Sequence, residues 1–224
     1  IINLSNIKGK NIIEIGPGTG QLTQEIIKIN PKKLILIEKD NNLINLLKTK
    51  YEHYKNIEFI NEDALNYDYS KIPNAIIYSN LPYNVSTKII FKLLLKFINI
   101  DEMIFMVQKE VAEKFDYNRT KKINKNNFFI FNSCFYKNLF NISNNVFYPK
   151  PKIQSSVITL KPKNLKGLDL NKLKIFTNKA FKNKRKKLKN NISFDFENEK
   201  IKRLLNQRVE SLQNNEMMYL FNKF

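Results

Sequence analysis

Short apolar runs alternate with stretches of helical spacing along the first two thirds of the chain. The runs that we predict to be strands are Asn11–Ile15, Lys33–Glu38, Ile57–Asn61, Ala75–Ser79 and Met103–Val107. Apolar residues recur every three or four positions in the stretches that we predict to be helices, Gln21–Asn30, Asn41–Tyr51 and Ser86–Ile98. Strands that alternate with helices predict a doubly wound, mainly parallel α/β sheet of the Rossmann-like type.

Beyond Val107 the alternation becomes less regular. Asn118–Asn127 is rich in Lys and Asn and has no apolar period, so we expect a mobile loop. Phe128–Tyr136 is predicted as an apolar helix, followed by strands at Leu139–Ile142 and Gln154–Leu160. Because no helix separates these two strands, we expect a β-hairpin at the edge of the sheet.

The last quarter of the chain is helical in character. We predict helices over Leu173–Asn190, Glu199–Asn206 and Asn215–Phe221, after a linker at Lys161–Asn164. This pattern predicts two domains, an α/β domain over residues 1–162 and a small basic helical domain over residues 163–224.

Charge suggests the kind of partner. The 224 residues contain 39 Lys and Arg against 20 Asp and Glu, for a net charge of +19. Such an excess attracts polyanions, most often nucleic acid. The alternative is the codon bias of an AT-rich genome, since Lys, Asn and Ile are all abundant. No apolar stretch is long enough to span a bilayer, so we expect a soluble protein without a membrane partner.

Other classes of site are poorly supported. The single Cys134 excludes an internal disulfide, and no constellation of His, Asp or Glu predicts a metal site. The chain opens on Ile1 without an initiator Met, so we expect it to be a piece of a longer protein.

A glycine-rich turn follows the first predicted strand. Gly16, Gly18 and Gly20 form a G-x-G-x-G sequence, and position 21 is Gln, so the dinucleotide fingerprint is not met. A strand leading into G-x-G-x-G is the pattern of S-adenosylmethionine enzymes. Glu38 ends the second strand, where a carboxylate can accept both ribose hydroxyls, and Asp63 follows the third, placed for the adenine amino group. The alternative is a tight turn with two surface acids.

A second motif, Asn80-Leu81-Pro82-Tyr83, follows the fourth predicted strand. The amide oxygen of Asn80 and the carbonyl of Leu81 can each accept a hydrogen from an exocyclic amino group, which favours a tetrahedral nitrogen with an available lone pair. Pro82 fixes the turn and Tyr83 offers a face for stacking. Beside a methyl donor, this motif predicts methylation of adenine, on a base that is unpaired or flipped out.

The chain resembles the ribosomal RNA adenine dimethyltransferases of the KsgA type almost from end to end. The segments that carry the resemblance are Glu14–Thr23, Glu62–Leu65, Asn80–Thr87, Phe105–Ala112, Phe147–Ser156 and Ala180–Asn191. The resemblance implies dimethylation of two adjacent adenines in a small-subunit rRNA hairpin, with S-adenosylmethionine as donor. It also implies an N-terminal Gln-Asn-Phe-Leu-type segment that helps to close the donor pocket, which this chain lacks.

The resemblance also assigns residues. The donor site would be formed by Gly16, Pro17, Gly18, Glu38, Lys39, Asp63, Ala64 and Asn80. The catalytic set would be Asn80, Leu81, Pro82, Tyr83 and Phe147, with Phe147 against the opposite face of the base or else simply packed in the core. Independently of the resemblance, the density of positive charge predicts contact with RNA phosphates at Lys182, Lys184, Arg185, Lys186 and Lys187, which could alternatively be a solvated helix face or a localisation signal.

Two other functions are weighed against the rRNA enzyme. One is a non-catalytic ribosome-assembly or organellar transcription factor on the same fold, and the other is DNA adenine methylation. We expect a monomer that acts on the pre-small ribosomal subunit. The AT-rich composition favours an organelle of a eukaryote, mitochondrion or plastid, with a bacterial cytoplasm as the alternative.

Overall fold

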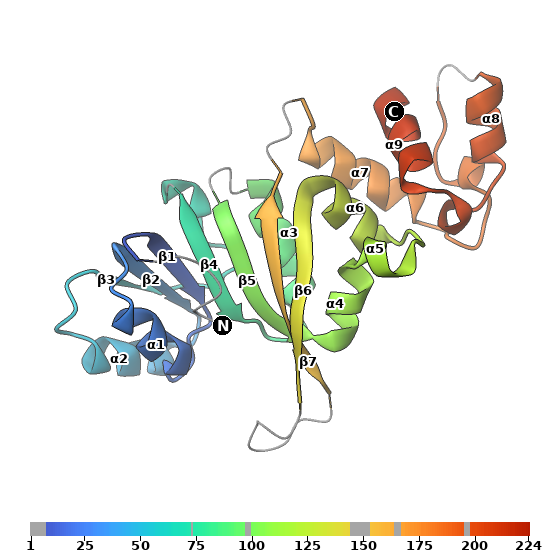
Figure 1. Ribbon diagram of the computed structural model, residues 1–224. Coiled ribbons are helices and arrows are strands. Elements are labelled where there is room, and N and C mark those ends of the chain that lie inside the picture. The colour runs from blue at the N-terminus through green and yellow to red at the C-terminus, as the bar shows by residue number, and fades with distance from the viewer. Residues whose placement is uncertain (1–7, 73, 97–99, 144–152, 164–166, 195–197) are drawn as a thin grey trace. The chain divides into compact units, whose positions relative to one another are not determined.

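The computed structural model describes residues 8–72, 74–96, 100–143, 153–163, 167–194 and 198–224 (Figure 1). Contacts divide the chain into two compact units. The first contains residues 1–112 and 137–162, and the second contains residues 113–136 and 163–224. The boundary predicted between residues 162 and 163 coincides with one edge of the second unit, which also takes in residues 113–136 from earlier in the chain. The assignment of a catalytic and an RNA-contacting domain stays a prediction.

A seven-stranded sheet forms the framework of the fold (Figure 1). Its strands are β1 (Asn11–Ile15), β2 (Lys33–Glu38), β3 (Ile57–Asn61), β4 (Ala75–Asn80), β5 (Ile100–Gln108), β6 (Cys134–Ile142) and β7 (Ser155–Pro162). The order is β3-β2-β1-β4-β5-β7-β6, with β1 to β5 parallel and β7 antiparallel to β5. This order confirms the predicted α/β sheet, and β6 lies beside β7 at its edge as expected.

Helices alternate with strands along the first part of the chain and predominate in the last part. Helices α1 (Gln21–Lys28), α2 (Asn41–Lys50) and α3 (Ser86–Lys96) connect β1 to β2, β2 to β3 and β4 to β5, and the short 3-10 helix η2 (Tyr69–Lys71) lies between β3 and β4. They are followed by α4 (Lys109–Phe115), α5 (Tyr117–Thr120), α6 (Lys125–Ser133), α7 (Leu170–Ala180), η4 (Leu188–Asn190), α8 (Glu199–Leu205), η5 (Val209–Ser211) and α9 (Asn214–Lys223).

Burial of the central strands holds the sheet in place. Leu34, Ile35, Leu36 and Ile37 of β2 are each at most 1% exposed, as expected for a strand covered on both faces. Ile26 of α1 packs with Leu36 in one hydrophobic cluster. Each such side chain contributes about 1.5–3 kcal/mol by leaving water. The burial fixes where β1 and β2 end, and therefore where the loops that follow them lie.

The Lys- and Asn-rich stretch after α4 differs from the prediction of an unstructured loop. Residues Tyr117–Thr120 form α5, and Asn124 is the N-cap of α6, where it forms a capping box with Asn127. Asn124 Oδ1 accepts the backbone N–H groups of Asn126 and Asn127, at 2.8 and 3.0 Å. The prediction missed this because asparagine was counted as a loop residue, although its short amide is an effective helix cap. The predicted helix Phe128–Tyr136 was also wrong at its end, because β6 begins at Cys134.

The second unit contains three of the longer helices and both later 3-10 turns. The predicted helix over Leu173–Asn190 is wrong in its second half, since α7 ends at Ala180 and the chain turns before η4. Asn191 stabilises this turn by donating from Nδ2 to the carbonyl of Ala180, at 2.8 Å. Closely spaced like charges in the basic run also disfavour a continued helix.

Candidate active site

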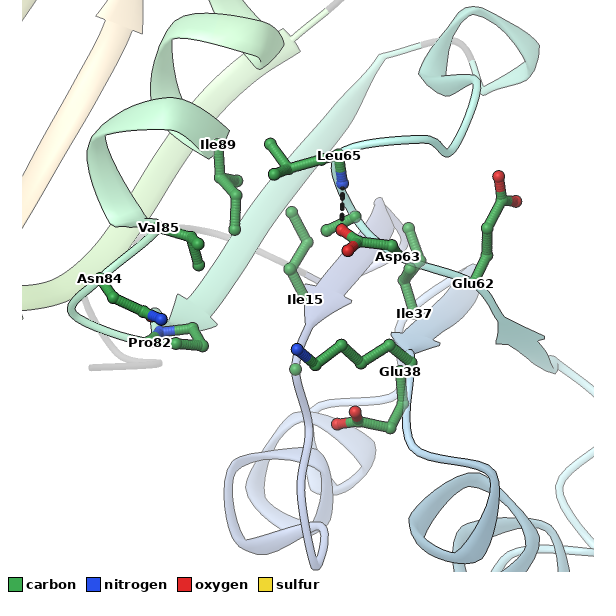
Figure 2. Close-up of a pocket in the computed structure, with 13 residues that line it drawn as sticks. Ile15, Ile37, Glu38, Glu62, Asp63, Leu65, Pro82, Asn84, Val85 and Ile89 are labelled. Carbon is green, nitrogen blue, oxygen red and sulfur yellow. Dashed lines mark hydrogen bonds between the residues drawn. The ribbon is translucent and has the colours of Figure 1, made fainter.

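A cavity of about 190 Å³ lies at the carboxyl ends of β1, β2 and β3 within the first unit (Figure 2). Parallel strands end at the same edge of a sheet, and ligands of such sheets bind outside that edge. The residues that line the cavity are Ile15, Gly16, Ile37, Glu38, Lys39, Glu62, Asp63, Ala64, Leu65, Pro82, Asn84, Val85 and Ile89. Backbone glycine, apolar side chains and acidic groups therefore converge on one cavity.

The glycine turn between β1 and α1 has the geometry that only glycine adopts easily. Gly16, Gly18 and Gly20 have φ of +66°, +57° and +84°. The N–H of Gly16 donates to the carbonyl of Ile37 at 2.9 Å, which ties the start of the turn to β2. Nothing lies within 4 Å of the position that a Cβ would take at Gly16 or Gly18. The turn therefore leaves open space for a ligand to approach its backbone.

Glu38 stands at the end of β2 with only 8% of its surface exposed. Its carboxylate accepts two backbone N–H groups, from Gly18 at 3.3 Å and from Asp40 at 3.0 Å. These bonds fix the side chain at the cavity. A carboxylate has about four lone-pair sites, so both oxygens keep capacity for ligand hydroxyls.

Asp63 follows β3 and is held by its own loop. Its Oδ1 accepts the N–H of Leu65 at 2.7 Å, the bond drawn in Figure 2. Its backbone carbonyl accepts from the N–H groups of Asn66 at 2.7 Å and Tyr67 at 3.1 Å. The carboxylate is thus held at the cavity wall, and Oδ2 takes no part in the hydrogen bond with Leu65.

The Asn80–Tyr83 turn begins where β4 ends. Asn80 pairs with Met106 of β5 and its side chain is exposed, while the N–H of Leu81 donates to the carbonyl of Met106 at 3.2 Å. The carbonyl of Pro82 accepts from the N–H of Ser86 at 3.0 Å, so the turn leads directly into α3.

The structure brings together much of the predicted donor site. Gly16, Glu38, Lys39, Asp63 and Ala64 line the cavity, while Pro17 and Gly18 lie in the same glycine turn. Asn80 is not among the lining residues. The roles of all these residues stay predictions.

The predicted catalytic set is less closely gathered. Pro82 lines the cavity, and Asn80, Leu81 and Tyr83 belong to the same turn without lining it. Phe147 lies outside the described residues.

Several lining residues were missed by sequence reasoning. Leu65, Val85 and Ile89 add apolar wall, and Glu62 and Asn84 add polar groups. Val85 and Ile89 are four positions apart next to the Asn80 motif, which puts them on one side of a helix start, and that spacing was a usable signal. For Glu62 the available signal was its place beside Asp63 in the Glu62–Leu65 segment that carries the family resemblance.

Glu14 is a further unexpected feature next to the glycine turn. Its side chain on β1 is 1% exposed and accepts from the Thr23 hydroxyl of α1 at 2.6 Å. Burial raises the pKa of this carboxyl to about 7, and the Thr23 bond acts in the opposite direction. The pair joins the two elements that flank the glycine turn.

The basic run of the second unit lies in a turn, not on a helix face. Its predicted RNA-contacting residues are all exposed, and they are Lys182, Lys184, Arg185, Lys186 and Lys187. Leu188 is fully buried beneath the run and donates its N–H to the carbonyl of Gln207 at 2.7 Å. A β-bridge pairs Lys187 with the exposed Arg208, which the sequence did not single out. RNA binding by the run stays a prediction.

The residues that the structure describes contain neither a candidate metal site nor a membrane-spanning helix. No group of three or more His, Cys, Asp or Glu side chains there is arranged to hold a metal ion. None of the helices in that part of the chain is long and apolar enough to cross a membrane.

Comparison with known sequences places the chain among enzymes of one kind. The sequence model of the family described as "Ribosomal RNA adenine dimethylase" matches residues 1–224. A protein of Malacoplasma penetrans named "Ribosomal RNA small subunit methyltransferase A" is 38% identical over 202 residues, covering 88% of this chain and 72% of that protein. A protein of the same name from Buchnera aphidicola is 40% identical over 215 residues, and the match covers 91% of this chain and 81% of that protein.

Comparison with solved structures confirms the fold class. A dimethyladenosine transferase from Plasmodium falciparum superimposes with a TM-score of 0.79 at 24% identity, covering 99% of this chain and 94% of that one. The 23S rRNA methyltransferase ErmE superimposes with a TM-score of 0.73 at 19% identity, and the match covers 96% of this chain and 91% of the ErmE chain. At these identities the likeness concerns the fold.

Proposed function

We propose that this chain, which belongs to the ribosomal RNA adenine dimethylase family, dimethylates N6 of two adjacent adenines in a small-subunit rRNA hairpin. The observation that carries the proposal is the cavity itself. Its donor-side wall holds Glu38 and Asp63 at the ends of adjacent strands, and its other wall includes Pro82 of the Asn80–Tyr83 turn. One cavity thus borders a nucleoside-binding edge and a turn suited to an amino-bearing base.

The residues present suit S-adenosylmethionine as the methyl donor. The backbone at Gly16 and Gly18 faces open space that a Cβ would partly fill, as required for close approach of a ligand. The fixed carboxylate of Glu38 would accept the ribose hydroxyls, and Asp63 would accept from the adenine amino group. S-adenosylmethionine, when bound, supplies an electrophilic methyl group attached to a positively charged sulfur.

The chain's own part in the reaction is to orient the acceptor nitrogen. Adenine N6 is a poor nucleophile because its lone pair is delocalised into the ring. The Asn80 amide oxygen and the Leu81 carbonyl would each accept one N6 hydrogen and so favour an available lone pair. Tyr83 would stack on the base, and alignment would supply most of the rate. No strong base is required, because N6 is positively charged once it has gained a methyl group, and one proton on it then becomes acidic and is released to water.

The second unit supplies a surface for the RNA. It carries 21 Lys and Arg against eight Asp and Glu, so most of the net charge of +19 lies there. Exposed cations that contact phosphates make affinity strongly salt-dependent. We infer that the substrate is the pre-small ribosomal subunit and that the chain acts as a monomer.

For the compartment we propose two possibilities in order. The AT-rich composition supports an organelle of a eukaryote, and the bacterial sources of the two relatives named above support a bacterial cytoplasm. Expression of tagged protein in the source cell, followed by fractionation, distinguishes them.

The test is methyl transfer from tritiated S-adenosylmethionine to small subunits that lack these methyl groups. We expect dimethyladenosine in the recovered rRNA with the wild-type chain. Asn80→Ala should lower kcat by about 100-fold or more, as loss of one preorganised hydrogen-bonding group at a reacting centre does. Asn45→Ala, at an exposed position of α2, is the matched control and should retain full rate.

The outcomes separate the candidate functions. Full turnover by Asn80→Ala would contradict the role of that amide. No transfer by the wild type, with subunit binding retained, would favour the non-catalytic assembly factor. Equal methylation of DNA would instead favour the DNA enzyme.

A further inference from the structure

Lys92 joins two parts of the first unit that are distant in sequence. It lies on α3, and its ammonium donates to the carbonyls of Leu65 at 2.5 Å and Tyr67 at 2.9 Å. The same ammonium lies 5.5 Å from the centre of the Tyr69 ring, in a cation–π contact. Burial lowers the pKa of Lys92, so the group is partly removed from water and its partners must replace that water.

Lys92 holds the loop that follows β3. This loop contains Asp63 and forms one wall of the cavity. Within the loop, the hydroxyl of Tyr69 donates to the carbonyl of Ala64 at 3.0 Å, and the rings of Tyr67 and Tyr69 meet edge to face at 5.0 Å. Both contacts join residues within the loop and do not connect it to another element. The ammonium of Lys92 connects it to a helix, and hydrogen bonds from a charged donor are the stronger kind.

The helix that carries Lys92 also carries the opposite wall. α3 begins at Ser86, with two residues between it and the Asn80–Tyr83 turn, and Val85 just before the helix and Ile89 within it line the same cavity. Lys92 is three positions beyond Ile89 and therefore on a neighbouring part of the helix surface. One rigid helix thus contacts the donor-side loop through Lys92 and begins at the acceptor turn.

We propose that Lys92 is a positioning residue that fixes the Asp63–Tyr67 loop against α3 and so sets the width of the donor pocket opposite the acceptor turn. The inference rests on the proposed function, because it assigns this cavity to S-adenosylmethionine. Loss of the ammonium leaves the carbonyls of Leu65 and Tyr67 without their donor. The loop then relaxes, and donor affinity falls while the residues of the acceptor turn stay in place.

Three variants test this role. Lys92→Met keeps an unbranched side chain without the charge, Lys92→Arg keeps a cation that can donate to two carbonyls, and Lys88→Met is the control at an exposed position one turn earlier on α3. The probe is S-adenosylhomocysteine, titrated calorimetrically in the absence of RNA. We expect Lys92→Met to raise Kd about 10-fold or more, Lys92→Arg to restore it to within about threefold, and Lys88→Met to leave it unchanged.

Two readouts distinguish positioning from a general loss of structure. In methyl transfer, Lys92→Met should raise KM for S-adenosylmethionine about as much as Kd, with kcat within about threefold and KM for the subunit unchanged. Amide hydrogen exchange should accelerate in the peptide that covers residues 62–69 and not in β1 or β2. Wild-type affinity in Lys92→Met, an equal loss in Lys88→Met, or faster exchange throughout the unit would each overturn the inference.

Failure of the proposed function gives a different result. A wild-type chain that binds no S-adenosylhomocysteine contradicts the donor assignment itself. The exchange rates of residues 62–69 then decide whether Lys92 fixes the loop.

Discussion

The phenolic oxygen of Tyr83 lies 2.7 Å from Oγ of Ser155. Tyr83 belongs to the turn after β4, whereas Ser155 is the first residue of β7 and is fully buried. In the sheet, β5 lies between β4 and β7, so the bond spans two strand positions. It restricts the orientation of the Tyr83 ring, which is the proposed stacking surface for the substrate base.

Tyr83→Phe keeps the ring and removes this bond, so we expect kcat/KM to fall about fivefold, the equivalent of one net hydrogen bond. Ser155→Ala should have the same effect. The double variant should be no worse than either single one, since both remove the same interaction. Tyr83→Ala also loses stacking, for a further loss of about 1–3 kcal/mol. Additive effects of Tyr83→Phe and Ser155→Ala in methyl-transfer assays would contradict the coupling.

Gly20→Ala should destabilise the first unit more than an ordinary glycine substitution. At Gly20, φ is +84° and a Cβ would lie 2.7 Å from Cδ2 of Leu47 and 3.2 Å from the ring of Tyr51. We expect the free energy of unfolding to fall by about 2 kcal/mol or more, measured by urea denaturation. Gly9→Ala is the control, because φ is +69° there and nothing lies within 4 Å, so only the backbone strain of about 1–2 kcal/mol remains. Equal losses would exclude the steric contribution.

Glu14 should make stability depend on pH. Its pKa is raised to about 7 in the folded chain, so the folded state binds the proton more tightly than the unfolded state. This contribution is fully present below about pH 4.5 and is lost as pH rises to about 7, a change of about 3 kcal/mol. Glu14→Gln resembles the protonated form and can still accept from Thr23. Its urea unfolding free energy should therefore exceed that of the wild type at pH 8 and match it near pH 4.5. Glu52→Gln, at an exposed site, should show no such difference.

Lys187 and Arg208 should act together in RNA binding. The β-bridge between them extends the basic run with a cation from a separate stretch of chain. Lys187→Glu with Arg208→Glu should weaken rRNA binding and reduce the slope of log K against log salt by about 0.7–0.9 per lost phosphate contact. Lys32→Glu with Lys48→Glu makes the same charge change at exposed positions of the first unit. An equal loss in that control would mean that net charge alone explains the effect.

Much of the sheet could be predicted from sequence because burial on both faces leaves a visible trace. Leu34–Ile37 is apolar at every position, and the strand it predicts matches β2. Glu38 and Asp63 could be placed at the cavity for the same reason, since strand ends determine where the following residues lie.

Features that depend on contacts between distant residues left no such trace. The ammonium of Lys92 contacts carbonyls more than twenty positions earlier, and the hydroxyls of Tyr83 and Ser155 are 72 positions apart. The helix cap at Asn124 was not predicted for another reason. One asparagine in a run of lysines and asparagines has no pattern that marks it as a cap. The turn after Ala180 depends on Asn191, which lies beyond the helical stretch itself.

The second unit is assembled from two separate stretches of chain, and this limits how the protein can be divided. The rings of Phe128 on α6 and Phe176 on α7 lie 6.2 Å apart, so the two stretches share one core. A fragment ending at Pro162 would keep α6 without α7 and expose the side of Phe128 that packs on Phe176, which favours aggregation. A soluble catalytic fragment would therefore require a short linker in place of residues 113–136 as well as removal of the C-terminal helices.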